Sequence, residues 1–359
     1  MKKIVPITIC LFICTGIFAQ PSPQAKTPGQ VAASAYIPYA GTILSSGTYG
    51  LFPAEMQQIY LTAVTYAWMT PSFITAPEKA VPQAGAALAF ESAGLLMAGH
   101  TDWNVPVSLS DAFWNIGWKL NYWTMYEGYA KTRSLCPEAN ESFHSVSFKD
   151  ALKAPFSWDV LSRKEVAYPL LGLLAGGTLF EILSGTDNAV WNTGKAYIGQ
   201  KEVPVALGIA YNAAVSTASY LFTGIGEEAL FRGVGYEEMK RSLGRVPAAL
   251  IDSLLFSAVH VPQELLAGMD APTALGNYLL RSAVAAGLQL VYEQSGLESS
   301  IAVHVWEDII CSMLLYLFQG GVPETTAPTA NIAPTNGRVN TAVNACMGTA
   351  PTFSIEFTW

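Results

Sequence analysis

The stretch VPVALGIAYNAAVSTASYLFTGIGEEALFRGVG, residues 203–235, decides the fold class because it joins a long apolar run to an abrupt group of charges. The apolar part is long enough to cross a bilayer, and a helix satisfies every backbone polar group within one segment. At its end stand the adjacent carboxylates Glu227 and Glu228, and Arg232 follows four positions after the second. Charge in such a segment is costly, which indicates a function for these residues.

The composition supports a membrane protein. Of 359 residues, 51% are hydrophobic and 13% are charged, whereas a soluble domain carries about 25% charged residues. The mean hydropathy is +0.30. The formal net charge is −8 and no basic stripe exists, which argues against nucleic acid as a partner. The expected partner is the lipid bilayer.

The sequence predicts an all-α, polytopic transmembrane bundle of about eight spans. The predicted spans are Ala54–Met69, Val81–Gly99, Ala112–Ala130, Val166–Ser184, Val203–Gly235, Ala248–Val261, Thr273–Tyr292 and Leu297–Phe318. The first three are weaker, and the third contains Lys119 and Glu127, so it can instead lie at the membrane interface. Gly172 and Gly176 have GxxxG spacing, which allows a close helix–helix approach.

The N-terminus has the pattern of a secretory signal peptide. Lys2 and Lys3 precede an apolar core, and Ala19 ends it, so cleavage is expected after residue 19. An uncleaved first helix is the alternative. The following residues, up to about Tyr39, are interpreted as a short exposed lead.

The basic residues predict the orientation. They concentrate in 131–164 and 237–246, and both connections are expected to face the cytoplasm. With eight spans, the N- and C-terminal segments of the mature chain are then extracytoplasmic, and the expected location is the inner (cytoplasmic) membrane.

Four regions follow from this reading. They are a signal peptide (1–19), an N-terminal extension of weakly hydrophobic helices (20–164), a hydrophobic core (165–320) and a polar tail (321–359). The tail ends in PTFSIEFTW, whose alternation is typical of a strand. We interpret it as an appended extracytoplasmic strand. Its likeness to the last strand of an outer-membrane barrel leaves a component of the outer membrane or of envelope assembly as a minor alternative.

The motif EEALFR separates two neighbouring carboxylates. Glu228 and Arg232 are four residues apart and share a helix face, so they can pair. Glu227 is turned about 100° away, which leaves it free. The structural alternative is a solvated charge pair at a helix end. Glu237 and Glu238, further along, are interpreted as ordinary loop charges.

Two further motifs place histidines in apolar helices. FSAVH contains Phe256 and His260, and HVWED contains His304 and Asp308 four residues apart on one helix face. Each alone can be a structural contact that stabilises the bundle. Together with a glutamate they can activate water: imidazoles bind a metal or hydrogen-bond an oxyanion, and a carboxylate acts as general base. The implied chemistry is hydrolysis, or proton-coupled work, in a cavity within the bilayer.

The three motifs in this order resemble the CPBP intramembrane proteases, which include the CaaX-prenyl endopeptidases of the Rce1 type and the bacterial Abi proteins. That family shows EExxxR, FxxxH and HxxxN or HxxxD on successive membrane helices. The resemblance covers roughly 165–320, and Asp308 stands where many members carry asparagine. The matching residues are Glu227, Glu228, Arg232, Phe256, His260, His304 and Asp308.

The resemblance implies an intramembrane endopeptidase that acts on membrane-associated proteins or peptides. Glu227 would activate water, while His260, His304 and Asp308 would bind a metal such as zinc or stabilise the oxyanion. The second glutamate and the arginine of EExxxR would set the geometry of the pocket. The HExxH spacing of soluble zinc proteases is absent from this set, so a glutamate-only mechanism stays open. The competing hypothesis is a non-catalytic membrane scaffold or immunity-type binding protein of the same fold.

Overall fold

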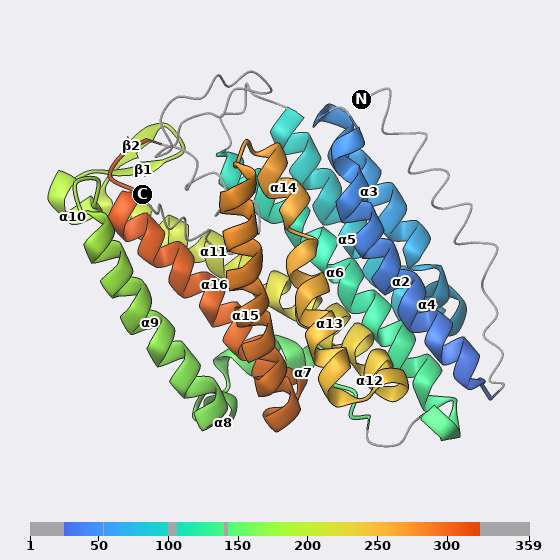
Figure 1. Cartoon of the computed structure of the whole chain (residues 1–359). Helices are drawn as coiled ribbons and strands as arrows, with labels where there is room; N and C mark the ends of the chain where they lie inside the picture. Colours follow the sequence, from blue (N-terminus) through green and yellow to red (C-terminus); the bar gives the residue numbers. More distant parts are fainter. Residues whose placement is uncertain (1–24, 53, 100–105, 140–142, 324–359) are drawn as a thin grey trace.

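The computed structural model describes residues 25–52, 54–99, 106–139 and 143–323, and this part of the chain forms a bundle of tilted helices (Figure 1). The predicted signal peptide, His100 and the alternating tail lie outside the described residues. The prediction of an all-α fold is confirmed for the described part, with one small exception. The exception is a hairpin of β1 (Ala196–Ile198) and β2 (Lys201–Val203) at the edge of the bundle.

The described N-terminal part contains four helices of 15 residues or more and three short ones. They are α2 (Pro28–Thr48), α3 (Ala54–Trp68), α4 (Thr70–Thr75), α5 (Pro77–Gly99), α6 (Val107–Ser134), α7 (Phe148–Lys153) and α8 (Trp158–Leu161). Short 3₁₀ turns lie at Tyr49–Leu51, Pro137–Ala139 and Ala154–Phe156.

The C-terminal part carries the three sequence motifs. Its helices are α9 (Lys164–Ser184), α10 (Val190–Thr193), α11 (Val205–Glu228), α12 (Glu237–Leu243), α13 (Arg245–Ala258), α14 (Val261–Leu266), α15 (Ala271–Ser295) and α16 (Leu297–Gln319). A π-helix, Ala229–Tyr236, joins α11 to α12 without a break. Gly244 (φ 83°) and Gly296 (φ 81°) end α12 and α15 in left-handed backbone, which glycine adopts without steric cost.

The chain is a multi-pass membrane protein. Four helical segments are long and apolar enough to cross a bilayer: Lys164–Leu183, Val205–Leu243, Arg245–Leu266 and Leu297–Gln319. The other four predicted spans also fall on helices (α3, α5, α6 and α15) but do not meet the same length and composition criteria. The total of about eight spans therefore stays a prediction.

The interpretation of the residues before Tyr39 as an exposed lead is wrong. Helix α2 begins at Pro28 behind a capping box, in which Thr27 and Gln30 exchange side-chain and backbone hydrogen bonds. One face of α2 is buried, with Val31 and Tyr39 exposed by 0% and 3%. The segment reads as polar because its buried face contains the small polar residues Ser34, Thr42, Ser45 and Ser46, while apolar Ile37 and Leu44 are exposed.

The close approach that the GxxxG spacing of Gly172 and Gly176 allows is not made within the described residues. A Cβ atom built on either glycine meets no other atom within 4 Å among the described residues. The contact of α9 with α16 is made instead at Gly177, where a Cβ atom would lie 2.9 Å from Leu314 Cδ1. A small-residue motif permits close packing but does not supply the partner helix.

Helix α6 lies inside the bundle. Residues 115–129 are buried without interruption, including the charged Lys119 and Glu127. Of the two readings that the sequence left open for this segment, the structure therefore disfavours an interfacial helix. In Figure 1, α6 lies between the N-terminal helices and the helices that carry the motifs.

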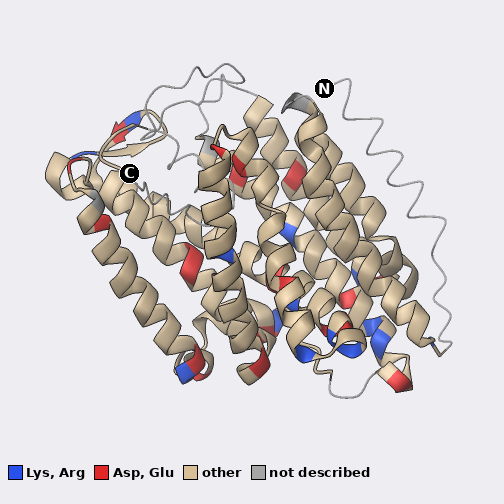
Figure 2. Ribbon diagram, in the orientation of Figure 1, with Lys and Arg blue, Asp and Glu red and all other residues tan. Residues whose placement is uncertain are grey.

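The two basic connections lie at the same end of the bundle, as their predicted common side requires. Arg133, at the end of α6, donates from Nη1 to Glu237 Oε2 at 3.1 Å, and Glu237 begins α12. Figure 2 shows most Lys and Arg residues gathered near this end, while the middle of the helices carries few charges. Lys119, Glu227, Glu228 and Arg232 are among the buried charges away from this end, and they belong to the site described next.

Candidate functional site

The first motif occupies an unusual piece of backbone. Glu227 and Glu228 are the last two residues of α11, and the π-helix begins at the next residue. All eight residues of the π-helix are buried. A π-helical segment widens the helix locally and is frequent at functional sites. It replaces the regular α-helix assumed from the sequence, although the i,i+4 pairing of the motif is kept.

Glu228 is held by Arg232, as the spacing predicts. Arg232 Nη1 lies 3.0 Å from Glu228 Oε1, and both side chains are completely buried. The same guanidinium donates from Nη2 to the Ala285 carbonyl at 3.0 Å, lies 4.6 Å above the Phe256 ring, and has Asp252 Oδ2 at 3.8 Å. These contacts fix Glu228 from several sides.

Glu227 is not free, which corrects the expectation from the sequence. Lys119 Nζ of α6 donates to Glu227 Oε1 at 2.6 Å, and both side chains are 4% exposed. The 100° rotation correctly separates Glu227 from Arg232, but a helix far away in the sequence supplies another cation. The second oxygen, Oε2, lies 3.6 Å from His304 Nε2.

His304 connects the first and third motifs. Its Nδ1 lies 2.8 Å from Glu228 Oε1, and its Nε2 lies 3.7 Å from Asp308 Oδ2. The common face of His304 and Asp308 is confirmed. The contact of His304 with both glutamates of EExxxR was not specified by the sequence, and it places the last span directly against the end of α11.

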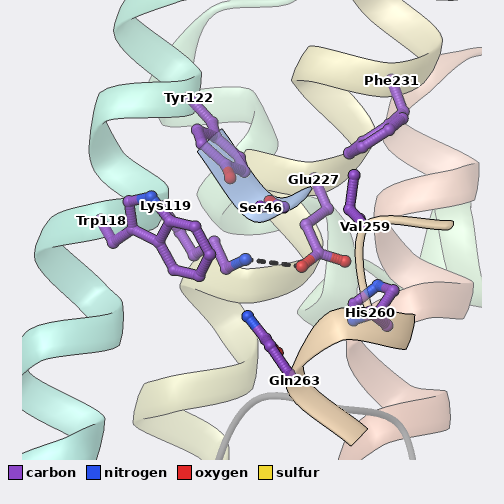
Figure 3. A pocket seen from close by; sticks show the side chains of 9 residues that line it. All are labelled: Ser46, Trp118, Lys119, Tyr122, Glu227, Phe231, Val259, His260 and Gln263. Atoms are coloured by element: carbon purple, nitrogen blue, oxygen red, sulfur yellow. Dashed lines mark hydrogen bonds and ion pairs between the residues drawn. The ribbon is translucent and has the colours of Figure 1, made fainter. Parts of the chain in front are cut away.

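His260 lies between α13 and α14, on the side of Glu227 opposite to Lys119 (Figure 3). Its ring packs edge-on against Phe256 at 5.4 Å, and the same phenylalanine contacts the ring of His304 at 5.9 Å. His260 is 6% exposed, and its Nε2 has no hydrogen-bond partner among the described residues. A buried imidazole nitrogen without a partner is available to a ligand.

A small cavity joins these parts (Figure 3). Its lining consists of Ser46, Trp118, Lys119, Tyr122, Glu227, Phe231, Val259, His260 and Gln263. Glu227 and His260 both line it. His304 and Asp308 are not among its lining residues, and His304 Nε2 contacts Glu227 Oε2 at 3.6 Å and Asp308 Oδ2 at 3.7 Å. The space open to the centre of a water molecule is about 10 Å³, close to what one ordered water needs.

Two glycines of the sequence TGIGEE let the neighbouring helices reach this point. A Cβ atom on Gly224 would lie 2.6 Å from Val305 Cγ2 of α16, next to His304. One on Gly226 would lie 2.5 Å from the carbonyl oxygen of Lys119 in α6. The motif therefore supplies the two carboxylates, and its two glycines leave room for α6 and α16, the helices that contact those carboxylates.

The donor set does not fit a bound metal in this arrangement. Among the described residues, no three His, Cys, Asp or Glu side chains lie close enough to share an ion. Glu227 is occupied by an ammonium, and His304 Nδ1 faces Glu228. The suggested metal ligands His260, His304 and Asp308 do not form one group among the described residues.

Sequence reasoning missed Lys119, Asp252 and Tyr39 as parts of the site. Tyr39 donates to Asp252 Oδ1 at 2.7 Å, and Asp252, itself 0% exposed, faces Arg232. Lys119 and Asp252 are each isolated charges in apolar helical segments. The cost of burying such charges is a signal that could have marked both as partners of other charges.

The interpretation of Glu237 and Glu238 as ordinary loop charges is wrong, because both lie in helix α12. They are 7% and 4% exposed. Glu237 pairs with Arg133 at 3.1 Å and with Lys240 at 3.4 Å. Glu238 accepts from Arg241 at 2.9 Å and from Tyr129 at 3.2 Å. They form a second charge cluster, at the basic end of the bundle.

Comparison with protein families identifies this region. Residues 210–310 match the family described as type II CAAX prenyl endopeptidase Rce1-like. The match includes all three motifs and confirms the resemblance to the CPBP proteases. Searches of curated proteins and of solved structures return no match to the chain.

Proposed function

We propose that this Rce1-like chain is an intramembrane endopeptidase that hydrolyses peptide bonds of membrane-associated proteins or peptides. The family match supports a peptide hydrolase in general. The observation that carries the more specific proposal is the shared cavity of Glu227 and His260, with His304 3.6 Å behind the glutamate. The first and second motifs thus each contribute a residue to the lining of this cavity, and the third contacts Glu227 through His304.

The residues supply the parts of a metal-independent hydrolysis. A water between Glu227 and His260 attacks the peptide carbonyl carbon and gives its proton to the Glu227 carboxylate. His260, with Nε2 protonated as donor, stabilises the negative oxygen that develops on the carbonyl. When the C–N bond breaks, Glu227 returns the proton to the departing nitrogen, so the products are a carboxylic acid and an amine.

The remaining motif residues hold this arrangement. Glu228 and Asp308 lie 2.8 and 3.7 Å from the two nitrogens of His304, which fixes the ring against Glu227. Arg232 holds Glu228 in turn. Burial strengthens each of these electrostatic contacts because little solvent screens them.

The competing function is a membrane scaffold in which the same ion pairs only hold the helices together. The occupied state of Glu227 gives this alternative some support, because a glutamate bound to Lys119 also fits a structural role. The two functions differ in what they require. A scaffold needs the pair to be stable, whereas an endopeptidase needs the carboxylate oxygen that faces the cavity.

A comparison of membrane proteomes tests the proposal. Cells producing the wild type, Glu227→Ala or Glu202→Ala are compared for peptides that accumulate or disappear. Glu202 is a matched control because it is 56% exposed on the β-hairpin. We expect changes in Glu227→Ala alone. Identical proteomes for all three would remove the support for proteolysis. A phenotype retained by a stable Glu227→Gln variant would favour the scaffold.

We also propose the inner membrane as the location, with both ends of the mature chain outside the cytoplasm. The common end of the two basic connections supports this orientation. Membrane fractionation and cysteine labelling of the 237–246 connection from each side test it. Recovery with the outer membrane, or labelling from the periplasmic side, would contradict it.

A further inference from the structure

We propose that Lys119 is a positioning residue for hydrolysis, and that α6, outside the matched segment 210–310, completes the catalytic site. The inference rests on the proposed function of Glu227. In this arrangement Lys119 holds one oxygen of Glu227 and keeps the carboxylate ionised, while the other oxygen is left for water. The Rce1-like segment is then incomplete without the N-terminal extension.

The two carboxylate oxygens of Glu227 have different neighbours. Lys119 Nζ donates to Oε1 at 2.6 Å, a short charge-assisted hydrogen bond. Oε2 receives no such donor, and its described neighbour is His304 Nε2 at 3.6 Å. Figure 3 shows the lysine reaching Glu227 from one side of the cavity, with His260 on the other.

The Lys119 ammonium is surrounded by one carboxylate, that of Glu227, and by two aromatic rings. Glu227 is the single carboxylate with which Lys119 forms an ion pair among the described residues. The ammonium also lies 4.0 Å from the Trp118 ring centre and 5.0 Å from that of Tyr122. Both rings line the same cavity and attract a cation through their π faces. The aromatic residues thus hold the lysine at the site.

The backbone is also built for this contact. Gly226, next to Glu227, faces the carbonyl oxygen of Lys119 itself, at 2.5 Å from the position of a Cβ atom. The backbones of α6 and α11 therefore lie close together at the residue that carries the ammonium. A chance surface pair does not require such clearance.

A cation is needed here because an isolated buried carboxylate takes up a proton, and a protonated glutamate cannot act as base. The other titratable groups around Glu227 are His304, His260, Tyr122 and Asp308. Of these, His304 already contacts Glu228, and neither Tyr122 nor Asp308 supplies a positive charge. Lys119 is the basic side chain that forms an ion pair with Glu227 at hydrogen-bonding distance among the described residues.

The opposite role is an inhibitory latch, in which the ammonium blocks Glu227 until α6 moves. The two roles predict opposite effects of removing the charge. A latch predicts faster cleavage after its removal, whereas a positioning residue predicts slower cleavage and a changed pH dependence.

The test uses full-length protein in lipid vesicles and a dye–quencher peptide that ends in a prenylated CaaX sequence. Cleavage rates are measured against pH for the wild type, Lys119→Met, Lys119→Arg and Lys195→Met. Methionine keeps the length of lysine without its charge, and Lys195 is a matched control with a 52% exposed side chain. We expect the acidic limb of the Lys119→Met profile to move to higher pH by roughly one to three units.

Lys119→Arg and Lys195→Met should keep the wild-type limb. A folded Lys119→Met variant with an unchanged profile, or with faster cleavage at every pH, would overturn the inference. If Lys119→Met and Lys119→Arg both kept the acidic limb of the wild type, the lysine would only pack against its neighbours and would not position Glu227.

A stability measurement covers the case in which Lys119→Met does not fold. The thermal midpoints of Lys119→Met, Glu227→Gln and the double variant are compared. If Lys119 serves the charge of Glu227, the second substitution should restore a large part of the midpoint lost in Lys119→Met. A double variant as unstable as Lys119→Met would contradict the pairing.

Failure of this inference can be distinguished from failure of the proposed function. Wild type and Glu227→Gln that cleave the probe equally would refute the role of Glu227 itself. A wild type that cleaves while Glu227→Gln does not, together with an unchanged Lys119→Met profile, would refute the role of Lys119 alone.

Discussion

The chain contains two pairs of adjacent glutamates, ten residues apart, and they differ in what surrounds them. Glu227 and Glu228 lie in the middle of the bundle, and Glu227 lines a cavity together with His260, whose buried Nε2 has no hydrogen-bond partner in the described part of the chain. Glu237 and Glu238 lie at the basic end, equally buried. Both pairs are bound by cations, so burial and ion pairing alone do not distinguish a site from a structural cluster.

The two glutamate pairs differ in how many of the hydrogen-bonding groups around them have a partner within the protein. At the basic end, Arg133 donates to a backbone carbonyl, to Tyr129 and to Glu237, which also accepts from Tyr292. In the middle, Glu227 Oε2 and His260 Nε2 keep capacity toward the cavity. A saturated cluster holds helices together, and an unsaturated one can bind a reactant. The predictions below test this distinction.

Glu227→Gln should have the largest effect. We expect cleavage of the CaaX probe to fall by about 10²–10⁴-fold, the contribution typical of a general base. Glu237→Gln should leave the rate per folded molecule unchanged, because Glu237 lies in the saturated cluster. Initial rates are normalised to folded protein. Equal losses of cleavage rate in Glu227→Gln and Glu237→Gln would contradict the distinction between the two glutamate pairs.

Arg232→Met should lower the free energy of unfolding by about 3–5 kcal/mol, since it leaves buried carboxylates without their cation. Glu228 loses a 3.0 Å partner and Asp252 a 3.8 Å one, all 0% exposed. Arg245→Met is the matched control, because Arg245 is 59% exposed. Denaturant titration in detergent should separate the two, and similar losses would contradict the buried network.

Arg133→Met should cost less, about 1–3 kcal/mol. Glu237 keeps Lys240 at 3.4 Å and Tyr292 at 3.1 Å, so its charge is not left alone. The rate per folded molecule should match the wild type. A specific loss of rate at normal stability would mean that the basic end takes part in the reaction.

Gly226→Ala should destabilise by about 1–3 kcal/mol through overpacking against α6. The new Cβ would lie 2.5 Å from the Lys119 carbonyl oxygen. It should also slow cleavage, because it displaces Lys119 from Glu227. Gly176→Ala is the control, with no atom within 4 Å of its Cβ. Equal thermal midpoints for the two alanine variants would show that the helices do not approach there.

Zinc chelation should have the smallest effect. The described His, Cys, Asp and Glu side chains form no group of three that could hold an ion. Treatment of the purified protein with a zinc chelator should leave the cleavage rate unchanged. A loss that added zinc restores would instead support His260, His304 and Asp308 as ligands.

The sequence predicts contacts whose spacing is set by one helix. Glu228 with Arg232 and His304 with Asp308 are four residues apart, so helical geometry alone places each pair on one face. The order of the motifs also identifies the family. The sequence does not predict Lys119 with Glu227, which are 108 residues apart, because the packing of α6 against α11 sets that contact.

The same limit explains the other differences. Gly172 and Gly176 match a packing motif, but no helix lies against them in the described structure, whereas Gly226 has a partner without matching that motif. Glu237 and Glu238 read as loop charges because their partners Arg133 and Tyr129 come from another helix. Local patterns therefore predict the elements, and long-range packing decides which charges meet.

The most direct test of the central proposal is mass spectrometry of the probe after incubation with vesicle-bound protein in water enriched in heavy oxygen. If Glu227 activates water, the wild type releases a fragment whose new carboxyl group carries one heavy oxygen, and Glu227→Gln releases almost none. Labelled fragment formed by Glu227→Gln at the wild-type rate would contradict the role assigned to Glu227.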